Sequence, residues 1–237
     1  MQTVSLSLFR FDRAATRLWA IGQMGAARLS LGALPQARFW KLCGSGTGEG
    51  FTPRPNWSVW AILAVWDDTD TARRSVAEAA VYRRWRDHAA EDWTVFLHPY
   101  SARGKWAGVA PFSAHGQAPQ GAPVAALTRA TVRPVRALRF WSRVPDISAR
   151  IGADPEVMFK IGIGEVPLLH QVTFSIWPDT EAMARFARRG PHAEAIKAVR
   201  DEGWFREELY ARFRIAGQAG KWGGGDPLAP GLRKDAA

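Results

Sequence analysis

His192 is the residue whose type and spacing best suit metal chemistry in this chain. It follows Gly190-Pro191, and a proline at the first helical position predicts that a helix starts there. Counted from this start, His192, Ile196 and Val199 share one helix face, which we expect to be buried. A neutral imidazole on such a face can ligate a haem iron, and a helix N-terminus favours the neutral form. The alternative is a core or capping histidine whose hydrogen bonds are satisfied.

Four basic residues on expected strands are candidate partners for the carboxylates of such a cofactor. Arg212 and Arg214 alternate with apolar residues in a strand expected over 208–215. If the apolar face of that strand meets the helices, both arginines point into the fold and can pair with haem propionates. Lys41 and Lys160 stand at matching positions of two similar strands and are further candidates. For all four, the alternative is a solvated charge on the surface.

Other patterns that carry chemistry are missing from the sequence. No two histidines stand four residues apart, so a helical zinc pair is not formed. The single cysteine, Cys43, excludes an internal disulfide and a cysteine-based metal cage. The glycine-rich stretch 44–50 lacks the Lys-Ser/Thr of a phosphate-binding loop. No Ser-His-Asp order or Gly-x-Ser-x-Gly motif indicates a hydrolase.

The elements that must position these residues occur twice in the same order. Periodicity predicts strand, helix, strand, strand, helix and strand over residues 1–106, and the same series over 124–222. Residues 107–123 have the composition of a linker, and 223–237 that of a flexible tail. The halves share short motifs, such as Phe-Trp-Lys at 39–41 with Met-Phe-Lys at 158–160, and Gly-Lys-Trp at 104–106 and 220–222. A duplicated ferredoxin-like unit explains this order.

The expected strand 58–65 is apolar on both of its faces. Helices cover only one face of a ferredoxin-like sheet, so the other apolar face needs a partner. A second unit packed sheet to sheet supplies it. We therefore predict an α+β fold in which two fused ferredoxin-like units form an α+β barrel of the type usually made by dimers.

Charge and composition limit the partners of the chain. A formal net charge of +10 and a pI near 10.6 suit an anionic partner, which can be nucleic acid, an anionic membrane surface or an acidic protein. The basic residues are scattered rather than gathered in an arm, so no nucleic-acid footprint is predicted. No apolar run reaches the roughly 18 residues that span a bilayer, and no signal peptide is evident. We expect a cytoplasmic protein that is soluble or lies on a membrane surface.

Several stretches resemble one known family over nearly the whole chain. They are residues 1–11, 39–41 and 202–213, together with Gly44-Ser45-Gly46-Thr47-Gly48, Phe51-Thr52-Pro53, Phe159-Lys160-Ile161-Gly162 and Val172-Thr173-Phe174-Ser175-Ile176-Trp177. These stretches are similar to the spheroidene monooxygenases, carotenoid-biosynthesis enzymes of purple bacteria.

The resemblance implies a haem-dependent monooxygenase. Such an enzyme would use haem b, dioxygen and electrons from reduced ferredoxin to oxidise C2 of acyclic carotenoids, converting spheroidene to spheroidenone. Two successive hydroxylations would give a gem-diol that loses water to form the ketone. Related haem proteins of the α+β barrel fold carry the proximal histidine on a helix of the C-terminal unit, which His192 matches in kind. An acidic ferredoxin would favour a basic docking face. A membrane-dissolved substrate would favour a cytoplasmic protein in peripheral contact with the inner or intracytoplasmic membrane.

Two alternatives stay open. One is a different haem enzyme on the same barrel, with peroxidase-like or dehydratase activity. The other is a basic, non-enzymatic RNA-binding module made of two ferredoxin-like units. That module would need exposed aromatic residues on a strand of the Lys/Arg-Gly-Phe-Gly-Phe type, and residues 212–217 lack this pattern.

Overall fold

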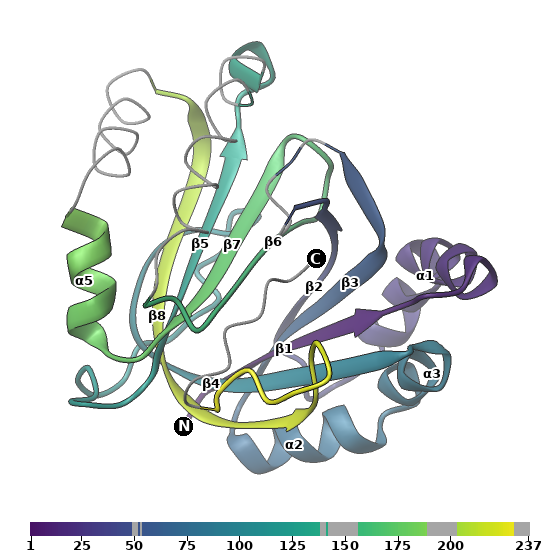
Figure 1. Ribbon diagram of the computed structural model, residues 1–237, viewed down its shortest axis with the longest axis horizontal. Coiled ribbons are helices and arrows are strands. Elements are labelled where there is room, and N and C mark those ends of the chain that lie inside the picture. Colours follow the sequence, from purple (N-terminus) through teal and green to yellow (C-terminus); the bar gives the residue numbers. More distant parts are fainter. Residues whose placement is uncertain (49–51, 53, 138–140, 142–155, 189–202, 230–237) are drawn as a thin grey trace.

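Two units of four strands each follow one another along the chain (Figure 1). The computed structural model describes residues 1–48, 52, 54–137, 141, 156–188 and 203–229. The first unit contains β1 (Thr3–Arg10), α1 (Ala14–Gly32), β2 (Phe39–Gly46), β3 (Pro55–Trp66), α2 (Thr69–Glu78), α3 (Ala80–His88) and β4 (Glu91–Gly104). The second contains β5 (Val124–Val132), the 3-10 helix η1 (Pro134–Arg136), β6 (Phe159–Gly164), β7 (His170–Trp177), α5 (Thr180–Arg188) and β8 (Phe205–Gly220).

The eight strands form one closed antiparallel barrel in the order β1-β3-β2-β6-β7-β5-β8-β4. Within each unit the fourth strand lies beside the first, and the third lies between the first and second, which is ferredoxin-like order. The two units join where β2 pairs with β6 and where β4 pairs with β8. The predicted α+β barrel of two fused units is therefore confirmed.

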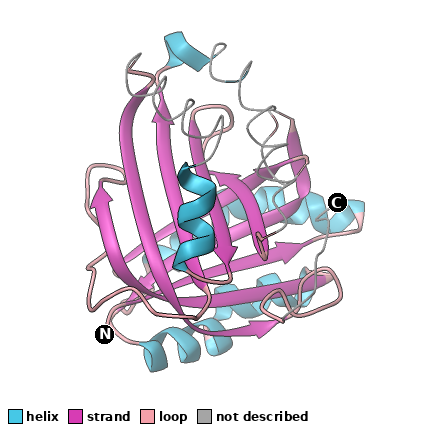
Figure 2. Cartoon of the chain, turned by 60° about the vertical axis from the view of Figure 1, so that its left-hand side comes forward, coloured by secondary structure: helices cyan, strands magenta, loops and turns pink. Residues whose placement is uncertain are grey.

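The helices of the first unit lie outside the barrel against β1, β3 and β4, and α5 lies outside the second half (Figures 1 and 2). Asp68 begins α2 because its carboxylate accepts from the Thr71 N–H at 2.8 Å, as an N-cap does. The single helix expected from this point to about residue 89 is two helices, since Ala79 has an extended backbone. The helix expected from Pro191 lies outside the described residues, as does most of the helix expected over 136–151.

Alternate residues of every strand face the barrel interior. These side chains form one buried apolar cluster to which all eight strands contribute, including Leu6, Leu63, Val95, Leu127, Phe174 and Phe213. The outer face of the first sheet carries a second cluster, rich in aromatic residues, beneath α1, α2 and α3. A third and smaller cluster joins α5 to the outer face of the second sheet.

The structure corrects the expected orientation of β8. Its apolar residues Leu209, Ala211 and Phe213 lie in the barrel interior, so Arg212 and Arg214 lie on the outer face of the sheet. The expectation that the apolar face meets the helices was wrong because the interior between two sheets is the larger apolar core in this fold.

The structure also corrects the matching of Lys41 with Lys160. In the first unit Phe39 of β2 pairs with Val65 of β3. In the second unit the equivalent pair is Phe159 of β6 with Ile176 of β7, so Phe39 corresponds to Phe159 and not to Met158. The motifs at 39–41 and 158–160 are thus offset by one residue, and one residue exchanges the two faces of a strand. Lys41 points into the barrel and Lys160 points away from it.

The two Gly-Lys-Trp motifs end β4 and β8 in equivalent turns. Gly104 has φ +95°, and a Cβ there would lie 2.1 Å from the Glu208 carbonyl oxygen. Gly220 has φ +81°, and a Cβ would lie 2.3 Å from the Asp92 carbonyl oxygen. Only glycine fits these close approaches. Each turn then folds its tryptophan back toward the barrel interior.

Candidate functional site

Two rows on the outer face of the second sheet carry mostly small side chains, and the first row has a cation at each end. Direct cross-strand pairing places Lys160, Ser175, Ala126 and Arg212 in one row. Directly paired residues share a face of the sheet. Three strand spacings of about 4.8 Å put the ends of this row about 14 Å apart. The next row is Gly162, Thr173, Thr128 and Tyr210.

The equivalent face of the first sheet is filled by bulky residues. There Trp60 pairs with Phe9 and Leu42 pairs with Ile62, where the second sheet has Gln171 with Ala130 and Gly162 with Thr173. The aromatic side chains of the first face pack on one another and on helix residues; Phe9 and Trp85, for example, have ring centroids 5.2 Å apart. At these paired positions the described strands of the second sheet thus carry smaller side chains than those of the first sheet.

Helix α5 covers one end of this second face. Its Ala182 and Met183 pack on Val124 and Trp177, and the rings of Phe186 and Trp177 contact each other with centroids 5.0 Å apart. The rows of Ser175 and Gly162 lie farther along the strands. In those rows Lys160 is only 6% exposed, so a cation is held close against the sheet.

The chemistry of this face fits a flat, largely apolar group that carries anionic substituents, as haem does. Lys160 and Arg212 flank the small residues, and either can bind a carboxylate. Arg214 lies on the same outer face but donates to the His115 carbonyl oxygen at 3.2 Å. His192, the expected iron ligand, lies outside the described residues. Within the described ranges no group of three or more His, Cys, Asp or Glu residues could hold a metal ion by itself.

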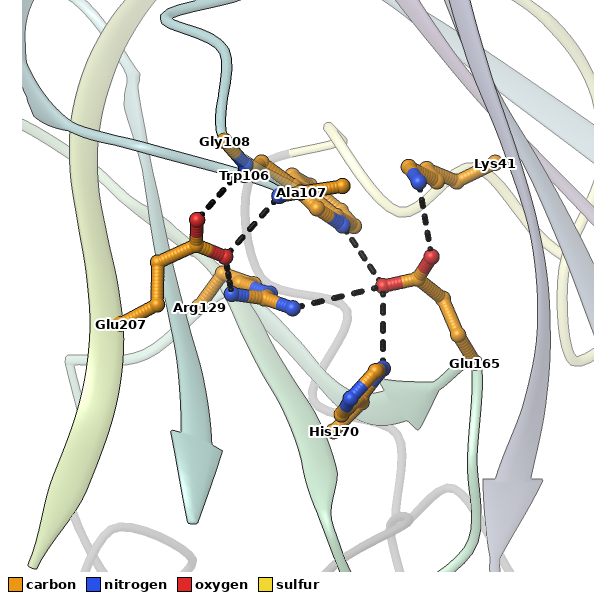
Figure 3. A network of polar contacts seen from close by, with 8 residues as sticks. All are labelled: Lys41, Trp106, Ala107, Gly108, Arg129, Glu165, His170 and Glu207. Atoms are coloured by element: carbon orange, nitrogen blue, oxygen red, sulfur yellow. Dashed lines mark hydrogen bonds and ion pairs between the residues drawn. The ribbon is translucent and has the colours of Figure 1, made fainter. Parts of the chain in front are cut away.

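A second polar site lies inside the barrel, at the end that Trp106 closes (Figure 3). Trp106 is fully buried, and its indole N–H donates to Glu165 at 2.6 Å. The same carboxylate pairs with Lys41 at 2.9 Å and lies 3.8 Å from Arg129 and 3.6 Å from His170 Nδ1. Lys41 is therefore part of this interior network rather than of the outer face.

Glu207 is the second carboxylate of the network. It accepts from the backbone N–H groups of Ala107 at 2.9 Å and Gly108 at 2.7 Å, and it pairs with Arg129. Burial alone would raise the pKa of Glu207, but these N–H groups and the guanidinium outweigh it, so the pKa lies below its ordinary value. Two carboxylates balance Lys41 and Arg129, so the network joins both units without an excess of charge.

Two further groups in the barrel are held uncharged. Burial lowers the pKa of His170, with Arg129 and Lys41 acting in the same direction and Glu165 against them, so the imidazole is neutral near pH 7. Burial also raises the pKa of the Cys43 thiol far above its usual range, which leaves it an inert core residue. A thiol that stays protonated in this way is a poor nucleophile.

Sequence reasoning missed Arg129, Glu165 and Glu207 as site residues. Their partners are distant in sequence, and no motif links them. One signal was available: Arg129 and Glu207 share the interior-facing parity of the apolar residues in their strands. A charge at such a position implies a partner on a neighbouring strand.

Comparison with known proteins gives the family. No protein-family model matches the chain. A spheroidene monooxygenase of Cereibacter sphaeroides is 59% identical over 98% of this chain and 72% of its own length. Those of Rhodobacter capsulatus and Rubrivivax gelatinosus are 56% and 36% identical, over 97% and 89% of this chain and 96% and 81% of their own. The chain belongs to the spheroidene monooxygenase family. This confirms the family resemblance and makes the chain an oxidoreductase of the monooxygenase class.

Solved structures support the fold of this family member. A crystal structure of aldoxime dehydratase has a TM-score of 0.63 at 14% identity, covering 92% of this chain and 84% of its own. Another, the aldoxime dehydratase OxdRE in complex with butyraldoxime, has a TM-score of 0.60 at 11% identity, covering 90% and 79%. At these identities the likeness concerns the barrel fold alone.

Proposed function

We propose that this chain is a haem-dependent monooxygenase that oxidises C2 of acyclic carotenoids, converting spheroidene to spheroidenone. The observation that carries the proposal is the identity of 59% and 56% to two spheroidene monooxygenases over nearly the full chain. The reaction would comprise two hydroxylations at C2, each consuming one dioxygen, two electrons and two protons. The gem-diol that results would lose water to leave the ketone. Reduced ferredoxin would supply the electrons.

In this proposal the haem lies against the outer face of the second sheet. Lys160 and Arg212 would hold its propionates from opposite margins, with Arg214 nearby on the same face. His192 would be the axial ligand, from the helix expected to cover that face. Bound haem supplies the activation of dioxygen needed to attack an unreactive C–H bond. Lys41 would not contact the haem, because it pairs with Glu165 inside the barrel.

The chain's own residues would orient the cofactor and exclude water. The small side chains of the Ser175 and Gly162 rows would suit a flat ring, and α5 with Trp177 and Phe186 closes one end of the face with apolar surface. An apolar boundary suits a polyene substrate, which offers the protein no strong hydrogen-bonding groups along its length. The net charge of +10 suits both an acidic ferredoxin and the anionic membrane surface from which such a substrate would come.

A visible spectrum and a turnover assay test this proposal together. Protein produced with haem supplied should show a Soret band, and with spheroidene, reduced ferredoxin and dioxygen it should form the ketocarotenoid. Haem-loaded protein that leaves spheroidene unchanged would overturn the carotenoid assignment. Protein that forms the ketone without haem would overturn the cofactor.

The axial ligand has its own test. His192→Ala should lose the Soret band, whereas the matched control His88→Ala should keep it, because His88 stacks on Trp19 in the first unit. Normal haem content in His192→Ala would remove His192 from the site and leave the turnover result untouched.

A further inference from the structure

Helix α1 presents an apolar face to the outside of the molecule. Leu18 is 70% exposed, Leu29 is 81% exposed and Ile21 is 40% exposed. The positions between them on the same face are also exposed, and they are occupied by Gly22 and Gly25. Helical spacing places these five residues along one stripe.

The opposite face of α1 is already used for packing. Ala20, Ala27 and Leu31 are fully buried against the first sheet. The helix is thus apolar on both sides, although it lies on the outside of the barrel (Figure 1). A contiguous exposed apolar stripe on a helix that already buries its opposite face marks an interaction surface.

The charged residues within α1 are all positive. No Asp or Glu occurs within α1. Arg13 precedes the helix, Arg17 donates to the Phe11 carbonyl oxygen at its start, and Arg28 is exposed near its end. From α3, Arg84 reaches Ser30 of α1 at 2.9 Å. The nearby carboxylate of Asp12, just ahead of the helix, is paired with Arg10.

We propose that α1 is the surface by which this protein docks on an anionic lipid bilayer, with Leu18, Ile21 and Leu29 inserted among the acyl chains. The arginines at its margins would bind lipid phosphates, as in helices that lie in a membrane interface. Among the described residues no helix is long and apolar enough to cross a membrane, so α1 would lie on the surface. This inference rests on the proposed function in one respect, since a membrane-dissolved substrate gives the docking its purpose.

A second copy of the chain is a poorer occupant of the stripe. Two copies related by a twofold axis would bring Arg17 and Arg28 near the same residues of the partner, and α1 has no carboxylate to pair with them. A bilayer with anionic headgroups supplies both the apolar layer and the missing negative charge.

Flotation with carotenoid-free vesicles tests the proposal on the full chain. Vesicles of equal parts phosphatidylglycerol and phosphatidylcholine should bind the protein, and pure phosphatidylcholine should bind it about tenfold less. The double variant Leu18→Gln with Leu29→Gln should bind anionic vesicles about tenfold less or weaker still, because two apolar side chains no longer enter the bilayer. The matched control is Val135→Gln, since Val135 is 87% exposed outside α1. Circular dichroism should show the same fold for all three proteins.

Three other outcomes would overturn the docking surface. Equal binding by the double variant and the control would place the contact elsewhere. A dimer that the double variant converts to a monomer, without vesicle binding by either, would assign the stripe to a second copy. Absence of vesicle binding in a protein that still forms ketocarotenoid would overturn the docking surface and leave the proposed function standing. Vesicle binding without ketocarotenoid formation would support the docking surface and overturn the proposed function.

Discussion

Replacing Glu165 by Gln should destabilise the barrel more than any single change on its surface. Gln keeps an acceptor for the Trp106 indole but removes the charge that pairs with Lys41 at 2.9 Å. Lys41 and Glu165 are 18% and 14% exposed, so water compensates only part of the loss. Arg129 would keep its ion pair with Glu207 in this variant. We expect a loss of about 3 kcal/mol, at the lower end of what an uncompensated buried charge costs, and a fall in Tm of about 6–12 °C.

Urea denaturation and thermal melting measure this effect, and a second substitution shows its cause. Adding Lys41→Met to Glu165→Gln removes the stranded ammonium and should recover about 1–2 kcal/mol of the loss. Asp67→Asn is the matched control, because its ion pair with Arg38 joins side chains that are 58% and 62% exposed, and it should melt close to the parent protein. A parent-like melt for Glu165→Gln, or a double variant no more stable than the single one, would refute the reasoning.

Three further predictions concern the outer face of the second sheet, where haem is proposed to bind, and the pH dependence of stability. The double variant Gly162→Leu with Thr173→Ile gives the second sheet the large side chains that the first sheet has at the equivalent positions. It should lower the haem-to-protein ratio after desalting at least about tenfold while the fold persists. Lys160→Met and Arg212→Met should each weaken haem binding about tenfold through loss of a charge-assisted contact, measured by haem titration. The unfolded chain binds more protons than the folded chain below about pH 6.5, because the pKa of His170 is lowered in the fold. Stability should therefore fall as the pH drops below that value, and His170→Gln should make urea midpoints between pH 7 and 5 depend less on pH.

Much of the fold was predictable because alternation and repetition are local signals. The strand order could be predicted from the duplication, and β5 spans the residues expected for it. Alternation does not say which face of a strand is interior when both faces are covered. For that reason Arg212 and Arg214 were expected on the wrong side of β8.

The site was harder to predict because its partners are not local. Lys41 seemed equivalent to Lys160 by motif, yet strand pairing makes Ile161 its counterpart. Glu165 follows β6 and draws its partners from β2, β5, β7 and the turn after β4. No spacing rule joins such residues before the barrel is closed. The small-residue face is likewise visible only when the paired rows of the two sheets are compared.

The two sheets of the duplicated barrel differ in the size of the side chains on their outer faces. Eight of the twelve tryptophans lie in residues 1–106, and several fill the outer face of the first sheet beneath its own helices. That unit needs no ligand to complete its core, so it can also carry a helix whose outer stripe is apolar. The second sheet has Gly162, Ala130 and Thr173 where the first has Leu42, Phe9 and Ile62. Smaller side chains at these positions bury less surface unless another group packs on them. The proposed haem would be such a group, with its carboxylates facing Lys160 and Arg212 at the two ends of the row.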